Sequence, residues 1–394
     1  MIKKPSTRKT LPCLLHVGQS KTGTTSIQST LFQELNDPGF ILISLDNFFG
    51  NQTLAGAFLP EYEADKSFFL QRIPAKRLGA RKASARCWLD SGLRVARRRG
   101  AIPILSAEVV AGLFSEPSMK DLRHFLSERG FTPHVIAYLR PPLDWIESGL
   151  QQLGRSGRTN LWSLTMDKLL GSGPWGIVER LDRVFGRDNV ELHLFDPDLF
   201  PGRCVVQHFC ERAGIALPKK IIRENDSLNL HALRFVHAYN RYILPGRENV
   251  PSILRRMLVI KNLEHLPGPP LRLHPELHSS FLGRLSEFQP MFQERMGGPL
   301  PATLIARKPD EGLSNEADLD KFEDEALDWL GRKLGEPVKS LWGSDRGREV
   351  ASSLDRLVRR FPANALDLIL DKSQLRLRRL RRQGTLRMEA VLAS

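Results

Sequence analysis

One short stretch near the N-terminus decides the fold: residues 13–25 read C-L-L-H-V-G-Q-S-K-T-G-T-T. The apolar run Cys13–Val17 has the length of a buried strand, and Thr25–Leu35 has a helical pattern. Between them, Gly18 and Gly23 permit a tight turn and a close approach of the backbone. A strand, a tight loop and a helix start form a site where backbone N–H groups can hold a phosphate.

The alternation of apolar runs and helical segments continues along the chain. Four more strands are predicted, at Phe40–Leu45, Ile102–Ser106, His134–Leu139 and Val190–Phe195. Helices are predicted at Ala83–Arg99, Met119–Arg129, Leu143–Gln152, Gly176–Phe185 and Pro201–Ala213. The predicted fold class is therefore α/β, a P-loop-type, mainly parallel sheet flanked by helices. In such sheets the ligand binds beyond the carboxyl ends of the strands.

Beyond about residue 230 the pattern is helical only. Helices are predicted at Leu230–Tyr242, Glu276–Met296 and Asp318–Leu334. Clusters of Pro and Gly mark the connections between them. We therefore predict one domain over residues 1–300, which carries the phosphate loop, and a helical, basic C-terminal extension over residues 301–394.

The composition is that of a globular protein with a strong excess of positive charge. The chain has 394 residues, 41% of them hydrophobic, and a net charge of +14. Such a surface favours anionic partners. No nucleic-acid reading element is present, so nucleic acid is not a predicted partner. The four cysteines show no metal-ligand spacing, and no stretch has the ~20 apolar residues of a membrane span, so we predict a cytoplasmic protein without a metal site.

The phosphate loop differs from the Walker A pattern of nucleoside-triphosphate enzymes in one respect. Gly18 and Gly23 match the two glycines of that pattern, but Thr24 stands where the pattern has its lysine. The lysine, Lys21, lies inside the loop instead. Kinases and ATPases use their lysine with Mg²⁺ to neutralise the β- and γ-phosphates. The displaced lysine therefore argues against a nucleoside-triphosphate enzyme.

A second motif follows the predicted strand His134–Leu139. Arg140 comes directly after this strand, two prolines open the next helix, and Ser148 lies on that helix. A guanidinium can hold a phosphate with two hydrogen bonds, and a hydroxyl can add a further one. The pattern is therefore consistent with a second phosphate site, and an arginine in a surface ion pair with a serine on a solvated helix face would explain it equally well.

The two motifs resemble those of the sulfotransferases that use 3′-phosphoadenosine-5′-phosphosulfate (PAPS). The loop S-K-T-G-T-T is similar to their P-K-[ST]-G-T-T, with Ser20 in place of proline, and the string around it resembles the bacterial, carbohydrate-type branch. The resemblance implies that the 5′-phosphosulfate is bound by Lys21, Thr22, Gly23, Thr24 and Thr25. It implies that Arg140 and Ser148 bind the 3′-phosphate. The region 1–300 is then the sulfotransferase domain.

A third resemblance lies at residues 223–229, which read R-E-N-D-S-L-N and open a predicted helix. A similar loop closes over the nucleotide in bacterial members of the family, which implies roles for Asn225 and Ser227. Ordinary capping of the helix by Ser227 or Asn229 explains the same residues equally well.

The predicted catalytic base is Glu108. It follows the strand Ile102–Ser106, and the segment Ser106–Glu108 resembles the S-[SA]-E segment of glycan-type sulfotransferases. Sulfuryl transfer to a hydroxyl requires removal of its proton, which a carboxylate within hydrogen-bond reach can perform. The alternative is that Glu108 caps the next helix. Histidines are weaker candidates, and His16 on the first strand is predicted to be a packed or hydrogen-bonded core residue.

These observations predict a sulfotransferase that transfers the sulfuryl group of PAPS to a hydroxyl acceptor, a carbohydrate or glycolipid, and releases 3′-phosphoadenosine 5′-phosphate (PAP). The arginine-rich tail, with five arginines between Arg376 and Arg382, predicts a peripheral contact with an anionic membrane. Two alternatives stay open. One is a P-loop nucleotide kinase or NTPase, and the other is a non-catalytic, basic glycan-binding protein.

Overall fold

The computed structural model describes residues 10–19, 21–44, 50–66, 70, 73–163, 176–223, 227–244, 250–298, 312–338 and 344–360. The chain divides into two compact units. Of the described residues, the first unit contains those up to 140 and 176–223, and the second contains 141–163 and those from 227 to 360. The first unit is built around a β-sheet, and the second is built from helices.

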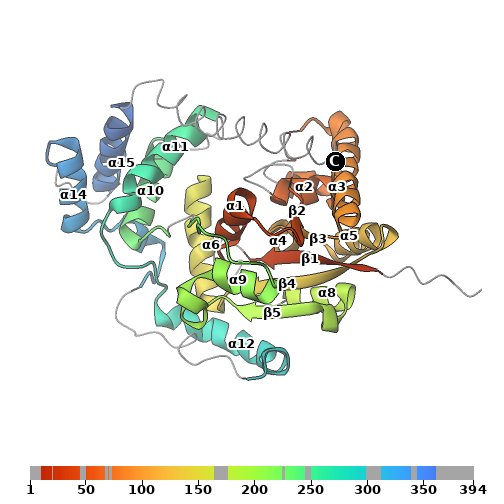
Figure 1. Cartoon of the computed structure of the whole chain (residues 1–394). Helices are drawn as coiled ribbons and strands as arrows, with labels where there is room; N and C mark the ends of the chain where they lie inside the picture. The colour runs from red at the N-terminus through yellow and green to blue at the C-terminus, as the bar shows by residue number, and fades with distance from the viewer. Residues whose placement is uncertain are drawn as a thin grey trace, which may run out of the picture. The chain divides into compact units, whose positions relative to one another are not determined.

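In the described part of the chain, five parallel strands form one sheet in the order β2-β3-β1-β4-β5 (Figure 1). The strands are β1 (Leu11–Gly18), β2 (Phe40–Leu42), β3 (Ile102–Ser106), β4 (Phe131–Leu139) and β5 (Val190–Leu194). Each overlaps a predicted strand, so the predicted α/β class with a parallel sheet is confirmed. In the central strand β1, His16 is paired with Ser106 of β3, and Gly18 with Tyr138 of β4.

Helices cover both faces of this sheet. On one face, Leu14, Ile104 and Ile136 form a core with α1 (Thr24–Glu34) and α9 (Val205–Ala213). The alternate residues of the same strands are buried too, because successive side chains of a strand point to opposite faces. The other helices that pack in this unit are α2 (Gly50–Phe58), α3 (Ala75–Arg99), α4 (Val109–Gly112), α5 (Glu116–Glu128) and α8 (Gly176–Phe185).

Two helices begin earlier than the sequence predicts. α3 starts at Ala75 rather than at Ala83, directly after Pro74, and α5 starts at Glu116, with a proline in its first turn. Proline is well tolerated there because its missing N–H has no partner in a helix anyway. The first two turns of α3 contain no buried residue, so the apolar periodicity that predicts a helix begins only later.

The second unit is a helical assembly. Its helices are α6 (Pro142–Ser156), α10 (Leu230–Tyr242), α11 (Val250–Asn262), α12 (Pro275–Met296), α14 (Asp324–Leu334) and α15 (Ser344–Arg359). Short 3₁₀ turns complete the two units at Glu61–Lys66, Arg187–Asn189, Pro197–Leu199, Pro201–Arg203, Leu263–His265 and Glu316–Asp320. The largest described core of this unit joins α10, α11, α14 and α15.

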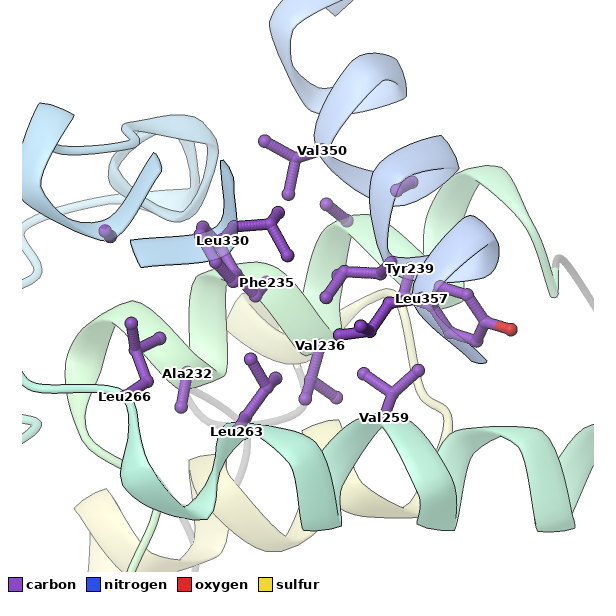
Figure 2. Packing of buried hydrophobic residues seen from close by; sticks show 14 of the residues in the cluster. Ala232, Phe235, Val236, Tyr239, Val259, Leu263, Leu266, Leu330, Val350 and Leu357 are labelled. Carbon is purple, nitrogen blue, oxygen red and sulfur yellow. The ribbon is translucent and has the colours of Figure 1, made fainter. Parts of the chain in front are cut away.

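Side chains of α10 pack toward α11 and toward α15 in this core (Figure 2). Val236 and Tyr239 of α10 belong to it, and so do Val259 of α11 and Leu357 of α15. The Tyr239 hydroxyl donates a hydrogen bond to Asp355 Oδ1 at 3.1 Å, which satisfies the one polar atom of a buried ring. The predicted boundary at residue 300 falls within this unit, whose core contains helices from both sides of it.

Some predicted features concern other parts of the chain. The arginine-rich tail, including Arg376–Arg382, lies outside the described residues, and so does Leu45. Cys13, Cys204 and Cys210 are buried and Cys87 is exposed, all four as free thiols. No helix within the described residues is both long enough and apolar enough to cross a bilayer.

Candidate anion-binding and proton-transfer site

The order of the strands defines where a ligand can bind in the first unit. The chain leaves β1 toward β2 on one side of the sheet and leaves β4 toward β5 on the other. In open α/β sheets, ligands bind at such a reversal, beyond the carboxyl ends of the strands. The Gln19 N–H donates to Tyr138 O at 3.2 Å, so the loop after β1 begins beside the end of β4. The two predicted phosphate motifs therefore start at neighbouring strands.

The loop after β1 has a conformation that its glycines make possible. A Cβ atom on Gly18 would lie 2.1 Å from Thr24 Oγ1 and 2.6 Å from Thr22 Oγ1, so no larger residue fits. Gly23 has a φ of 72°, in the left-handed region, and a Cβ there would lie 2.6 Å from a methyl of Val205. Lys21 also has a positive φ, 66°, which is uncommon for a residue other than glycine. Such strained backbone clusters at ligand-binding sites.

The loop leads directly into the N-terminus of α1. Gly23 is the N-cap residue, no side chain caps the helix, and its first turn carries no acidic residue. The first-turn N–H groups of a helix lack intrahelical partners, and the helix dipole makes this end positive. An anion at this end therefore meets amide donors and no competing carboxylate of α1.

Two threonine side chains of the loop are buried and hydrogen-bonded. Thr22 is fully buried, and its hydroxyl donates to Gln19 O at 2.7 Å. Thr24 is 1% exposed, and its hydroxyl is hydrogen-bonded to Glu108 and lies 3.5 Å from the Thr22 hydroxyl. Thr25 is partly exposed. The predicted contacts of Thr22, Thr24 and Thr25 with a phosphate stay predictions, but the Thr24 hydroxyl has a second partner that the sequence did not predict.

Arg140 lies against the same loop. Its backbone N–H donates to Gln19 Oε1 at 2.7 Å, and its Nη1 donates to Lys21 O. Its guanidinium carbon lies 5.8 Å from the ring centre of Phe195, the residue after β5. A Cβ on Gly23 would lie 3.5 Å from that same ring. The two cationic residues of the predicted site, Lys21 and Arg140, are thus brought together.

Sequence reasoning did not assign Gln19 and Phe195 to the site. Gln19 lies inside the loop itself, so its position between Gly18 and Gly23 was an available signal. Phe195 follows β5, and its N–H donates to Leu139 O at 2.7 Å. Only the strand order reveals that the end of β5 lies beside the end of β4. The exposed part of an aromatic ring at this place can pack against a flat ligand group.

Glu108 lies on the opposite side of the loop. It occupies the N-cap position of α4, where its side chain makes no capping hydrogen bond. Its carboxyl is hydrogen-bonded to Thr24 and interacts with the Lys21 ammonium. Burial raises the pKa of this carboxyl to about 7, although Lys21 and the hydrogen bond with Thr24 both act to lower it. A carboxyl with such a pKa exchanges protons readily at neutral pH.

The remaining predicted residues belong elsewhere. Ser148 lies on α6 in the second unit, is 3% exposed, and donates its hydroxyl proton to Trp145 O at 2.9 Å. Ser227 is exposed in the same unit, and Asn225 lies outside the described residues. Asn229 caps α10 by accepting from the Ala232 N–H at 2.8 Å. The shared phosphate site of Arg140 and Ser148 would join residues of two units and stays a prediction.

His16 occupies the position that the sequence predicts, in the core of the first unit. It is fully buried, its Nδ1 lies 2.7 Å from Ser106 Oγ, and burial lowers its pKa to about 3. His16 is therefore neutral near pH 7. Among the described residues, no three His, Cys, Asp or Glu side chains gather in an arrangement that could hold a metal ion.

Comparison with known proteins adds one structural likeness. No protein-family model and no curated protein matches the sequence. Among solved structures, the chain is similar to a crystal structure of a sulfotransferase from Alicyclobacillus acidocaldarius, with 18% sequence identity and a TM-score of 0.35. The similarity covers 61% of this chain and 98% of that one. A TM-score this low carries no argument about function, which must be inferred from the residues of this chain.

Proposed function

We propose that this chain is a sulfotransferase that transfers a sulfuryl group from PAPS to a hydroxyl group of an acceptor and releases PAP. One observation carries the proposal. A carboxyl with a pKa of about 7, that of Glu108, interacts with the lysine of an anion-binding loop and is hydrogen-bonded to a threonine of the same loop. Transfer of a sulfuryl group to a hydroxyl requires a base that removes the hydroxyl proton and a site that binds the anionic donor, and both are found at this loop.

The residues at the loop suit PAPS in charge. The uncapped start of α1 offers amide donors to the 5′-phosphate, and Lys21 adds a positive charge. Arg140, with Ser148, would hold the 3′-phosphate, and Phe195 would pack against the adenosine. When bound, PAPS supplies the sulfuryl group in an activated form, as an anhydride of sulfate and phosphate.

Each residue then has a distinct part in the reaction. Glu108 in its carboxylate form accepts the proton of the acceptor hydroxyl while the new S–O bond forms. Lys21 stabilises the negative charge that accumulates on the departing phosphate oxygen. The loop and Arg140 fix the orientation of the nucleotide, so that most of the rate enhancement comes from positioning and electrostatic stabilisation.

We propose a carbohydrate or a glycolipid as the acceptor. The segment Ser106–Glu108 and the loop both resemble the carbohydrate-type branch. The net charge of +14 would attract an acidic glycan or the surface of an anionic membrane. A cytoplasmic location and a membrane contact through the basic tail belong to the same proposal.

A P-loop kinase is the rival enzyme class, and one observation weighs against it. Thr24 occupies the position of the Walker A lysine, is 1% exposed, and is engaged with Glu108. Because no lysine stands at this position, the start of the helix has no side-chain charge that could neutralise a triphosphate. Lys21 carries the only lysine charge of the loop, inside the turn.

Calorimetry can separate these functions. For a sulfotransferase, PAP should bind at least about tenfold more tightly than AMP, because a charge-assisted contact to the 3′-phosphate is worth roughly 1.5–3 kcal/mol. Arg140→Ala should remove this preference, whereas Arg98→Ala, at an exposed position of α3, should retain it. Tighter binding of ATP with Mg²⁺ than of PAP would favour the kinase. Binding of heparin alone, unaffected by Lys21→Ala, would favour the non-catalytic protein.

Activity itself is tested by transfer of radiolabelled sulfate from PAPS to a panel of sugars, glycolipids and phenols. We expect incorporation into a carbohydrate-containing acceptor by the wild type and at least about a hundredfold less by Glu108→Gln, in keeping with the usual contribution of a general base. Equal incorporation by both proteins would remove Glu108 from the mechanism.

A further inference from the structure

A second set of polar side chains lies beneath the loop, at the junction of α1, β1 and β3. Gln28, in the second turn of α1, donates from Nε2 to Ser106 O at 2.9 Å and to Ser106 Oγ at 3.1 Å. The same Ser106 Oγ lies 2.7 Å from His16 Nδ1. Gln28, Ser106 and His16 are 7%, 4% and 0% exposed, so water does not compete for these bonds.

The directions of these hydrogen bonds follow from the donors available. The Gln28 amide can only donate from its nitrogen, so Ser106 Oγ accepts from it. The Ser106 hydroxyl oxygen has two lone pairs and one proton, so it can bond His16 Nδ1 in either tautomer of the ring while it accepts from Gln28. A neutral His16 agrees with the effect of burial, which lowers its pKa to about 3. The His16 ring packs against aromatic rings, with its centre 5.0 Å from that of Phe209 and 5.6 Å from that of Tyr138.

This arrangement fixes the backbone that leads to Glu108. Ser106 is the last residue of β3, and its carbonyl is held by Gln28. The next N–H, that of Ala107, donates to His16 O at 3.0 Å. The Glu108 carbonyl accepts from the N–H groups of Ala111 and Gly112 at 3.0 Å. Each of the three residues 106–108 is therefore held by a different neighbour, and α1 contributes both the bonds from Gln28 to Ser106 and the bond between Thr24 and the Glu108 side chain.

We propose that Gln28 is a positioning residue, which through Ser106 holds the end of β3 against α1 and so keeps Glu108 beside the loop. The same helix carries Gly23 and Thr24 at its start and Gln28 one turn later, so it connects the anion site and the base as one rigid element. The pair of His16 and Ser106 supports Gln28 from the other side. This inference rests on the role proposed for Glu108, and Gln28 itself touches no reacting atom.

The test uses Gln28→Met, which keeps the length of the side chain and removes the donor. We expect kcat for sulfate transfer to fall about 10- to 100-fold, as misplacement of a catalytic group by about 1 Å does elsewhere. PAP affinity should stay within about threefold, because the loop and Arg140 are unchanged. Gln33→Met is the matched control, since Gln33 lies on the same helix, is partly exposed, and should leave kcat and affinity unchanged.

A second variant separates the two bonds of Gln28. Ser106→Ala removes the hydroxyl but keeps the carbonyl, so the bond from Gln28 to Ser106 O survives. We therefore expect a smaller loss of kcat for Ser106→Ala than for Gln28→Met. An equal or larger loss would show that the hydroxyl network, and not the tie to the strand, positions Glu108, which would overturn the proposal in its stated form.

A readout without substrate distinguishes this inference from the proposed function. The carboxyl of Glu108 can be titrated by NMR of ¹³C-labelled glutamate, assigned by its absence in Glu108→Gln. Gln28→Met should shift the pKa of Glu108, because a displaced carboxyl changes its burial, which raises the pKa, and its contacts with Lys21 and Thr24, which lower it. An unchanged pKa, or a parallel loss of kcat, PAP affinity and melting temperature, would overturn the inference. Failure of the wild type to transfer sulfate would refute the proposed function and leave this titration valid.

Discussion

Burial raises the pKa of Glu108 to about 7 and the hydrogen bond with Thr24 lowers it, so removal of that bond should have a calculable effect on the proposed reaction. A general base acts in its deprotonated form, so kcat/KM for sulfate transfer should rise with pH through a midpoint at the pKa of Glu108, about 7. With that midpoint, the carboxylate fraction grows about tenfold between pH 6 and pH 8. Thr24→Val removes the hydroxyl while nearly preserving the shape of the side chain.

The size of the shift follows from the strength of the bond. A hydrogen bond to a charged group contributes roughly 1.5–3 kcal/mol, and 1.36 kcal/mol corresponds to one pH unit. Because Glu108 is partly exposed, we take the lower end, so the midpoint should move upward by about one pH unit. The direction is upward because the hydroxyl stabilises the carboxylate, and its loss favours the protonated form. At pH 7, kcat/KM should therefore fall about fivefold, and at pH 9 it should nearly equal that of the wild type.

The assay is the pH profile of kcat/KM between about pH 5.5 and 9, which reports ionisations of the free protein. Thr24→Ser is the matched control, because it retains the hydroxyl and should retain the midpoint. The reasoning is refuted if Thr24→Val lowers the rate by the same factor at every pH, or if Thr24→Ser shifts the midpoint as far as Thr24→Val does. In the first case Thr24 would serve the nucleotide and not the base.

Three further predictions concern stability and binding. Glu108→Gln should stabilise the chain by about 1–2 kcal/mol at pH 8, since burial raises the pKa of this carboxyl to about 7 and its ionisation therefore opposes folding. The gain should develop as pH rises from 4.5 to about 7 and be absent below pH 4.5, as denaturant unfolding across this range can check. Gly18→Ala should lower PAP affinity more than about tenfold in calorimetry, because the added methyl would lie within 2.6 Å of two threonine hydroxyls. Gly112→Ala is the control and should leave the affinity unchanged, because a methyl there meets nothing within 4 Å. Leu330 is fully buried in the core of the second unit (Figure 2), so Leu330→Ala should lower the free energy of unfolding by about 2–5 kcal/mol in chemical denaturation. Met257 is half exposed, so Met257→Ala should lower it by less than about 1 kcal/mol.

The sequence was a reliable guide to features that depend on neighbours along the chain. The strand, the loop with Gly18 and Gly23, and the helix start were all predicted, because a glycine turn between an apolar run and a helical pattern has few other solutions. The position of Arg140 directly after a strand was predicted for the same reason. The early start of α3 was missed because its first turns bury little apolar surface.

The partners of the polar side chains were decided by the tertiary structure. The sequence offered Thr24 as a ligand of phosphate and Glu108 as either a base or a helix cap, and it could not choose between those two. Their hydrogen bond exists because β1 and β3 are adjacent, with His16 opposite Ser106, a pairing between residues far apart in the chain. The same register gives Gln28 its partner and raises the pKa of Glu108 through burial. Local sequence determines which backbone conformation a segment adopts, but the protonation and the hydrogen bonds of a buried group depend on what the fold packs around it.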